Sequence, residues 1–459
     1  STTVAAHLCN LRTGEVLASA GVMNPQIRFG EDLMSRVSYV MMNPGGDLEM
    51  TKVIRSAIND LALNVTSQAK RELDEVVEVA FVGNPIMHHL LLGINPIELG
   101  GAPFALATDE SVRVRARDLN LKLHTNTRCY VLPCIAGHVG ADTAGMILSE
   151  APHHREAMTL LVDIGTNAEI VLGNNQRLLA ASSPTGPAFE GAQISSGQRA
   201  APGAIERVRI DRKTLEPRFQ VIGSELWSND PGFSKDTKGI GVTGICGSGI
   251  IEVIAEMYLA GILSQDGVIN GNLAAKSKHI IADGRTFSYV LSNGQHIIHV
   301  TQNDVRAVQL AKAALYAGIR LLMERMEIKT VDRIRLAGAF GSHIDVKYAT
   351  VLGLIPDCDL KQVSSAGNSA GAGARIALLN YESRQEIEEV VRQVEKVETA
   401  VEAKFQEHFV QAMAFPHKVD SFPNLAKVIE LPAEIDMQNH ASSIQQRKIR
   451  RRRTSNKAL

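Results

Sequence analysis

A short segment in the middle of the chain combines residue types that can bind a phosphate and a cation. Residues 160–172 read LLVDIGTNAEIVL, a pattern that predicts a buried strand, a tight turn and a second strand. The turn contains the carboxylate of Asp163, a residue without a Cβ at Gly165, and the polar side chains of Thr166 and Asn167. Backbone N–H groups at such a turn can hold a phosphate while the carboxylate orders Mg²⁺ or its waters. In the alternative interpretation, the Asp and Asn side chains only satisfy donors within a β-hairpin.

A second bend of similar composition stands at the start of the sequence. Ser1, Thr2 and Thr3 lead directly into the strand-like pattern VAAHLCNL, as the end of a D-x-G-S-T-T turn would. We therefore expect that further sequence precedes Ser1 in the natural protein. Two such hairpins in separate lobes can enclose one triphosphate, which favours the phosphate interpretation of the turn at Asp163.

Composition narrows the class of protein. The chain has 459 residues, of which 45% are hydrophobic, so we expect a large core divided between at least two lobes. Its 48 basic residues nearly balance its 49 acidic residues, which argues against nucleic acid as a partner. Five scattered cysteines indicate reduced thiols in an intracellular protein. No segment approaches the roughly 18 uninterrupted apolar residues of a membrane span, and no signal peptide is visible, so we expect a cytoplasmic protein.

Strand patterns alternate with helix patterns along the chain, which predicts an α/β protein of mixed sheets with helices packed on them. A helical stretch is expected from about residue 32 to residue 61, where apolar residues recur at intervals of three and four. The polar segment APHHREAM is a candidate boundary between lobes. The expected divisions are a first lobe, residues 1–150, a second lobe, residues 151–382, and a C-terminal extension, residues 383–459. The basic end of that extension is expected to be a solvated arm that binds no nucleic acid.

Five segments, in order along the chain, resemble the landmarks of the superfamily of sugar kinases, heat-shock chaperones and actin (ASKHA). They are the end of a first phosphate hairpin (residues 1–3), a connecting helix (137–149), a second phosphate hairpin (163–167), an adenosine turn (336–343) and a second connecting helix (367–377). The resemblance implies a two-lobed actin-like ATPase fold in which each lobe is a mixed sheet with packed helices. It also implies that the nucleotide lies in the cleft between the lobes and that the final helix, at about 367–380, returns to the first lobe.

Three longer strings are similar to the C-terminal ATPase domain of the reductive activators of corrinoid proteins. They are TGPAFEGAQISSGQRAAPGAI (185–205), TGICGSG (243–249) and TQNDVRAVQLAKAA (301–314). The resemblance covers roughly residues 1–379. It implies an enzyme that uses ATP to reduce a Co(II) corrinoid to Co(I) on a partner, a corrinoid (cobalamin-carrying) methyl-transfer protein.

One feature of that family is missing from this sequence. Its members carry an N-terminal plant-type [2Fe–2S] domain with the spacing C-x4-C-x2-C and a distant fourth cysteine. Cys129 and Cys134 stand at C-x4-C, but the next required position is Gly137. We therefore expect this chain to be a fragment, with the [2Fe–2S] electron donor outside it.

The resemblance implies roles for a set of residues. Asp163 is expected to be the catalytic carboxylate, acting on the attacking water or on Mg²⁺ through water, and Glu190 is a second candidate ligand of Mg²⁺ or contact of the partner. The residues expected to bind ATP are Ser1, Thr2, Thr3, Gly165, Thr166 and Asn167 at the phosphates, Gly247, Ser248 and Gly249 at a helix start, Gln309 and Lys312 on a helix facing the adenosine, and Gly338, Ala339, Phe340 and Gly341 in the adenosine turn.

Several of these residues have simpler explanations. The GSG segment at 247–249 can equally mark a close helix contact, Phe340 can be core, and Gln309 and Lys312 can lie on a solvated helix face. His88, His89 and His138 are expected to be core or surface residues and not cobalt ligands.

Two other functions remain open from the sequence. One is a small-molecule kinase of the same fold, and the other is a nucleotide-switched binding module. The oligomeric state, a homodimer included, is also open.

Overall fold

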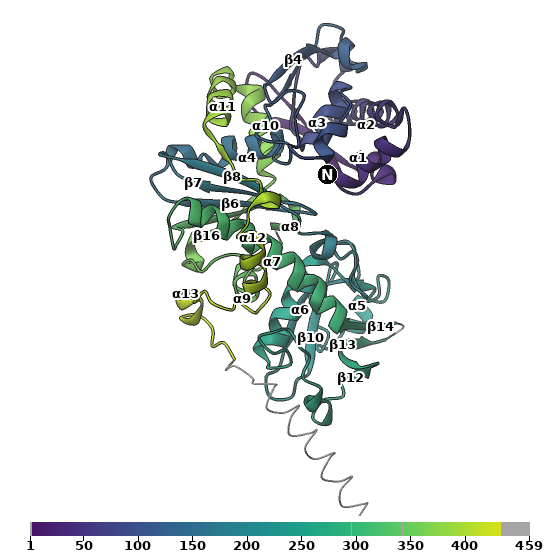
Figure 1. Cartoon of the computed structure of the whole chain (residues 1–459). Helices are drawn as coiled ribbons and strands as arrows, with labels where there is room; N and C mark the ends of the chain where they lie inside the picture. Colours follow the sequence, from purple (N-terminus) through teal and green to yellow (C-terminus); the bar gives the residue numbers. More distant parts are fainter. Residues whose placement is uncertain (1, 295, 342, 433–459) are drawn as a thin grey trace, which may run out of the picture. The chain divides into compact units, whose positions relative to one another are not determined.

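The computed structural model describes residues 2–294, 296–341 and 343–432, and the chain forms two compact units. The first unit comprises residues 1–186, 317–343 and 358–408, and the second comprises 187–316, 344–357 and 409–459. Figure 1 shows the elements of each unit. The units divide the chain at other positions than the predicted lobes, so the boundaries at residues 150 and 382 stay a prediction.

A six-stranded sheet with the order β16-β15-β6-β7-β8-β17 forms the centre of the first unit. Its strands are β6 (Thr159–Ile164), β7 (Ala168–Gly173), β8 (Leu178–Ser183), β15 (Arg333–Ala337), β16 (Val363–Gly367) and β17 (Glu395–Lys396). β6, β7 and β8 form an antiparallel meander, whereas β15 lies parallel to β6 and β16 lies parallel to β15. Every residue of β6 except Asp163 is buried, as expected for a central strand covered on both faces.

The N-terminal part of the first unit contains two smaller sheets. Their strands are β1 (Thr3–Cys9) paired with β2 (Val16–Met23), and β3 (Glu78–Phe81), β4 (Val112–Arg115) and β5 (Arg128–Val131) in the order β3-β5-β4. Three helices accompany them: α1 (Leu33–Met42), α2 (Gly46–Gln68) and α3 (Pro85–Leu92). The helical stretch expected at 32–61 is thus two helices. Asn43 caps α1 in an extended conformation and Gly45, before α2, has φ of 85°, so the chain turns between them.

Two helices of the first unit pack closely against each other. α4 (Ala141–Glu150) follows β5, α10 (Ser369–Leu379) follows β16, and the two pack together. The contact is backbone on backbone, because a Cβ on Gly373 would lie 2.0 Å from the carbonyl oxygen of Gly145. These are the two predicted connecting helices. α11 (Tyr381–Gln393) follows α10 and packs on both α10 and α4.

The second unit is built from two three-stranded sheets and the helices around them. The strands are β9 (Ala204–Ile210), β10 (Pro217–Val221), β11 (Gly244–Ile245), β12 (Ile280–Asp283), β13 (Thr286–Asn293) and β14 (Ile297–Thr301). The helices are α5 (Phe233–Asp236), α6 (Gly247–Leu259), α9 (Val346–Leu352) and α13 (Pro423–Ala426). The division between units at residue 317 falls inside α7 (Gln302–Arg325), and that at residue 409 inside α12 (Phe405–Gln411).

Within the described part of the chain, no helix has both the length and the apolar character that crossing a membrane requires.

Candidate functional site

The bend between β6 and β7 is held in shape by a neighbouring segment of the first unit. The N–H of Gly165 donates to the carbonyl of Asn167 at 3.1 Å. The hydroxyl of Thr185 donates to the carbonyls of Gly165 and Thr166, at 2.7 and 3.0 Å, and the N–H of Gly186 donates to the carbonyl of Thr166 at 2.9 Å. The carbonyls of the bend are thus bound by residues 185 and 186, which fixes the backbone around Asp163.

Three carboxylates influence one another at this end of the sheet. The pairing of β6 with β7 places Asp163 opposite Glu169, and Asp142 stands in the first turn of α4. Burial and the nearby Asp142 carboxylate raise the pKa of Asp163 to about 6. Burial, Asp142 and Asp163 raise the pKa of Glu169 well above its usual range, and burial raises the pKa of Asp142. Ionising all three groups together is therefore unfavourable without a cation.

This set of donors fits Mg²⁺. Carboxylate oxygens are the hard ligands that Mg²⁺ prefers, and the ion usually keeps several waters between itself and part of the protein. A bound divalent cation would also bring the three pKa values down, because it favours the charged carboxylates. Asp163 as a whole residue is partly exposed, although burial is the main cause of the raised pKa of its carboxyl group.

Gly338 makes room for the carboxylate of Asp163. β15 pairs with β6 so that Ala337 lies beside Asp163, and α8 (Gly338–Gly341) begins at the next residue. Gly338 has φ of 80°, and a Cβ at this position would lie 2.3 Å from Oδ1 of Asp163. Gly338 of the predicted adenosine turn and the predicted catalytic carboxylate are therefore neighbours. The binding roles of Gly165, Thr166, Asn167, Gly338 and Gly341 stay predictions.

Gln309 and Lys312 are fully buried within the second unit. The side-chain amide of Gln309 donates to the carbonyls of Asp266 and Met413, at 3.1 and 2.7 Å. The ammonium of Lys312 donates to the carbonyls of Ala414 and Pro416, both at 2.6 Å, and burial lowers its pKa well below the usual range. Neither side chain lies on a solvated helix face. Their polar ends hold the segment at 413–416, and a contact of either with adenosine stays a prediction.

The GSG segment begins α6 in the second unit. A Cβ on Gly249 would lie 2.2 Å from the carbonyl oxygen of Ile205 in β9, so close helix–strand packing is enough to require this glycine. The hydroxyl of Ser248 lies 3.3 Å from the thiol of Cys246. The predicted phosphate contacts of Gly247, Ser248 and Gly249 are untested.

The remaining predicted residues are placed as follows. Thr3 begins β1 and pairs with Met23, and the carbonyl of Thr2 accepts the N–H of Asn24 at 2.9 Å. Glu190 ends a short 3₁₀ segment, Pro187–Glu190, and is partly exposed. Ser1 and the side chains of Ala339 and Phe340 lie outside the part of the chain that the structure describes.

Asp142 and Glu169 are the site residues that were missed from the sequence. Glu169 did carry a signal, because a strand whose other residues are all buried contains one carboxylate directly after the turn. Asp142 lies inside the predicted connecting helix 137–149. Its contribution depends on where α4 begins relative to β6, which the sequence pattern does not give.

Two family models match consecutive parts of the chain. The model described as the C-terminal domain of RACo, the ASKHA domain, matches residues 157–426. The model described as the RACo middle region matches residues 1–155.

Individual relatives agree with the family models. The chain is 33% identical over 432 residues to a corrinoid activation enzyme, RamQ, of Eubacterium limosum, covering 91% of this chain and 70% of that protein. It is 27% identical over 407 residues to a [Co(II) methylated amine-specific corrinoid protein] reductase of Methanosarcina barkeri, covering 84% and 70%. A solved structure of a reductive activator for a corrinoid, iron–sulfur protein superposes with a TM-score of 0.78 at 34% identity. That match covers 91% of this chain and 65% of the activator, so the chain spans about two-thirds of its relatives' length.

The raised pKa of Asp163 predicts that Asp163→Asn stabilises the chain without ligands. The folded-state pKa of about 6 exceeds the ordinary value of about 3.9, so ionising Asp163 costs stability above pH 6, and this cost disappears as the pH falls toward 4. We expect a gain in the free energy of unfolding of about 1–3 kcal/mol at pH 8 and about a third of that gain at pH 4.5. Urea unfolding at both pH values measures this. The exposed Asp60→Asn is the control, and an equal gain at both pH values would contradict the assignment.

The position of Gly338 predicts a large cost for Gly338→Ala. The substitution adds a left-handed backbone penalty of about 1–2 kcal/mol and drives a methyl group into the Asp163 carboxylate. Gly284→Ala is the matched control, because Gly284 also has positive φ but a Cβ there meets nothing within 4 Å. In thermal unfolding, Gly338→Ala should lose clearly more stability than Gly284→Ala, and adding Asp163→Ala should recover most of the difference. Equal losses in the two single variants would show that the contact with Asp163 is unimportant.

Proposed function

Because this chain belongs to the RACo family, we propose that it is the ATPase and partner-docking part of an ATP-dependent reductive activator of corrinoid proteins. Its partner would be a corrinoid methyl-transfer protein whose cobalt has been oxidised to Co(II). One electron from a reduced [2Fe–2S] cluster converts Co(II) to Co(I) and leaves the cluster oxidised, while ATP is hydrolysed to ADP and phosphate. The observation that carries this proposal is the similarity, at 33–34% identity, to an enzyme and a solved structure named for corrinoid activation.

The need for ATP follows from the direction of the electron transfer. Co(I) corrinoids are strong reductants, so the electron must move from a cluster of moderate potential to cobalt at a lower potential. For a one-electron step, each factor of ten in the equilibrium constant corresponds to about 59 mV. Hydrolysis of ATP can offset several factors of ten in the equilibrium constant of electron transfer. It can do so if it changes how strongly the chain binds the Co(II) and Co(I) forms of the partner.

We assign the ATP and Mg²⁺ chemistry to the bend after β6. Asp163, with Asp142 and Glu169, would hold Mg²⁺ through carboxylate oxygens or waters, and Mg²⁺ would supply positive charge next to the phosphates. The N–H groups of Thr166 and Asn167 would bind phosphate oxygens, whereas the N–H of Gly165 is bonded to the carbonyl of Asn167. With Mg²⁺ bound, the carboxylate of Asp163 would be charged, and it would orient the attacking water and accept its proton as the bond to phosphorus forms.

The [2Fe–2S] cluster is assigned to a domain outside this chain. Cluster ligands must be thiolates. Cys129 and Cys134 are both buried, and burial raises the pKa of Cys129 to about 11 and that of Cys134 further. The C-x4-C pair is thus a pair of packed thiols. All five cysteines are present as thiols and not as disulfides, which supports a reducing compartment, the cytoplasm, for this chain.

The proposal predicts that a Co(II) corrinoid protein stimulates ATP hydrolysis by this chain. Phosphate release would be measured with Mg²⁺, ATP and the purified partner, and partner binding would be followed by calorimetry. Asp163→Asn should lower the stimulated rate by about 100-fold or more because the proton acceptor and Mg²⁺ ligand are lost, whereas Asp60→Asn should not change it. If the partner neither binds nor stimulates turnover, and ATP is consumed only with an added small metabolite, the protein is a kinase. If the partner binds but Asp163→Asn is as active as the unchanged chain, the site assignment is wrong.

A further inference from the structure

Two histidines and a glutamate of the first unit converge at a place that the proposed ATPase does not use. His153 and His154 lie in the 3₁₀ segment Pro152–His154, between α4 and β6, and Glu386 lies in α11. Nε2 of His153 lies 2.7 Å from Oε1 of Glu386, and Nε2 of His154 lies 2.6 Å from the same oxygen. One potential ligand atom from each residue lies within 4.8 Å of the other two. We propose that His153, His154 and Glu386 form a Zn²⁺ site.

The chemistry of the three side chains matches Zn²⁺. Imidazole nitrogens and a carboxylate oxygen are ordinary zinc ligands, at about 2.0–2.2 Å from the ion, and three protein ligands leave a fourth position for water or another ligand. Two neutral imidazoles and one carboxylate give the ligand set a single negative charge, which attracts a divalent cation. Cys, the softer ligand that would favour other metals, takes no part.

The present geometry is close to that of a bound site. Around a tetrahedral ion with these bond lengths, neighbouring ligand atoms are roughly 3.4 Å apart, so each histidine nitrogen must move away from the glutamate oxygen by less than about 1 Å. The side chains can make this movement, because that of His154 is 63% exposed and that of Glu386 is 31% exposed. The two rings are tilted by 43° and do not stack flat, so both Nε2 atoms can face one point.

The contacts of the His153 ring show which nitrogen would bind the ion. Nε2 is directed at the carboxylate of Glu386. Nδ1 is buried and makes no hydrogen bond within the described residues, so it faces away from the cluster. Nε2 is thus the ligand atom that we assign to His153.

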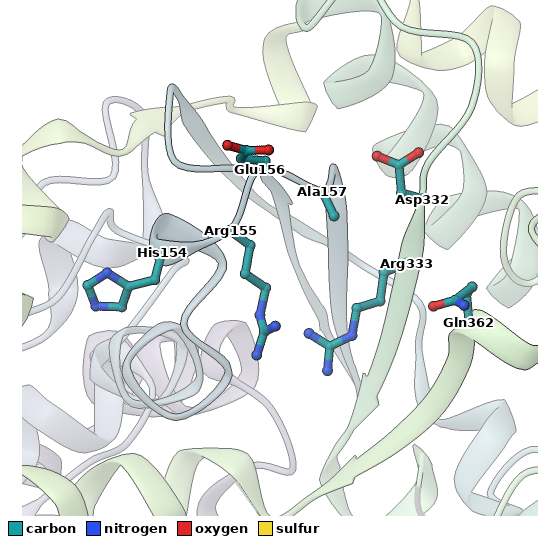
Figure 2. A pocket seen from close by; sticks show the side chains of 7 residues that line it. All are labelled: His154, Arg155, Glu156, Ala157, Asp332, Arg333 and Gln362. Atoms are coloured by element: carbon teal, nitrogen blue, oxygen red, sulfur yellow. The ribbon is translucent and has the colours of Figure 1, made fainter.

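His154 also lines a cavity of 680 Å³, and its side chain is 63% exposed, so a water can reach an ion bound at this histidine. The other lining residues are Arg155, Glu156, Ala157, Asp332, Arg333 and Gln362. Figure 2 shows the His154 ring and the Arg155 guanidinium leaving the chain in different directions, with the two arginines on the same side of the cavity. Burial and then Arg155 lower the pKa of Arg333, which agrees with two guanidinium groups near each other. The guanidinium of Arg155 thus lies near that of Arg333.

A bound ion would join two elements distant in sequence. Residues 153 and 154 lead into β6, the strand that contains Asp163, and residue 386 lies in the helix packed on α4 and α10. Zn²⁺ would thus connect the segment before β6 to α11. Because the ion would bind the folded chain and not a preformed site in the unfolded chain, it should stabilise the fold.

The test is a titration of the metal-free 459-residue chain with Zn²⁺ in a calorimeter. We expect one ion per chain and at least about tenfold weaker binding in His154→Asn and in Glu386→Gln, since each loses a ligand. The exposed His124→Asn is the matched control and should bind Zn²⁺ as the unchanged chain does. His154 is mostly exposed, so its replacement should not prevent folding, and circular dichroism checks this.

A second readout uses Co²⁺ in place of Zn²⁺. Tetrahedral Co²⁺ gives visible d–d absorption, which should appear with the unchanged chain and with His124→Asn but not with His154→Asn. The thermal midpoint should rise with Zn²⁺ in the same two proteins only. Absence of one-to-one binding by the unchanged chain, or equal binding by His154→Asn, would overturn the proposal. Neither measurement needs ATP or a corrinoid protein, so the result is independent of the proposed function.

Discussion

The cost of keeping three carboxylates close together at the end of one buried strand is the constraint on which the rest of the site depends. Asp163, Asp142 and Glu169 come from three different elements, and burial raises the pKa of each. The charge of Asp142 raises the pKa values of Asp163 and Glu169 further. Water would screen such a cluster if the chain could open. The sheet prevents this, because β6 is paired on both sides, by β7 and by β15. The fold thus maintains an unfavourable charge arrangement that a cation relieves, as expected where stability is given up for binding.

The scaffold controls each carboxylate through backbone contacts and not through side-chain packing. The register of β6 with β7 fixes Glu169 opposite Asp163. The start of α4 fixes Asp142, and α4 is held by the contact of its Gly145 with Gly373 in α10. Because Gly338 has no Cβ, the carboxylate of Asp163 fits beside it. The three glycines, Gly145, Gly338 and Gly373, tolerate little change, because a backbone oxygen or a carboxylate lies where a Cβ would stand.

Much of this could be predicted from the sequence. The segment LLVDIGTNAEIVL predicted the strand, turn and strand that are observed. The order of the five landmarks predicted the ASKHA fold and the three longer strings predicted the family, and both are confirmed. A local pattern was sufficient for these predictions, because the residues of the turn are contiguous in the chain and so are the residues of each family string.

The predictions that fell short concern contacts between distant segments. The pairing of Asp163 with Glu169 depends on strand register, and the place of Asp142 depends on helix packing. Gln309 and Lys312 do not lie on a solvated helix face, because both donate to carbonyls of the segment 413–416, about 100 residues later in the chain. Their predicted contact with the nucleotide is untested. From the sequence, His153 and His154 belonged to a polar segment predicted as a boundary between lobes. In the structure, Glu386 of α11 lies beside both histidines. No periodic pattern in the sequence identifies the partners in these long-range contacts.

The most direct test of the central claim is to follow the titration of Asp163 by NMR of ¹³C-labelled aspartate, without and with Mg²⁺ and ATP. Asp163→Asn identifies the signal. If the carboxylate cluster binds the Mg²⁺–nucleotide complex, Asp163 titrates near pH 6 in the free chain, and its pKa falls below the ordinary value of about 3.9 in the complex because the ion favours the charged form. A pKa that is the same with and without Mg²⁺ and ATP, under conditions where calorimetry shows the nucleotide bound, would mean that the nucleotide binds elsewhere.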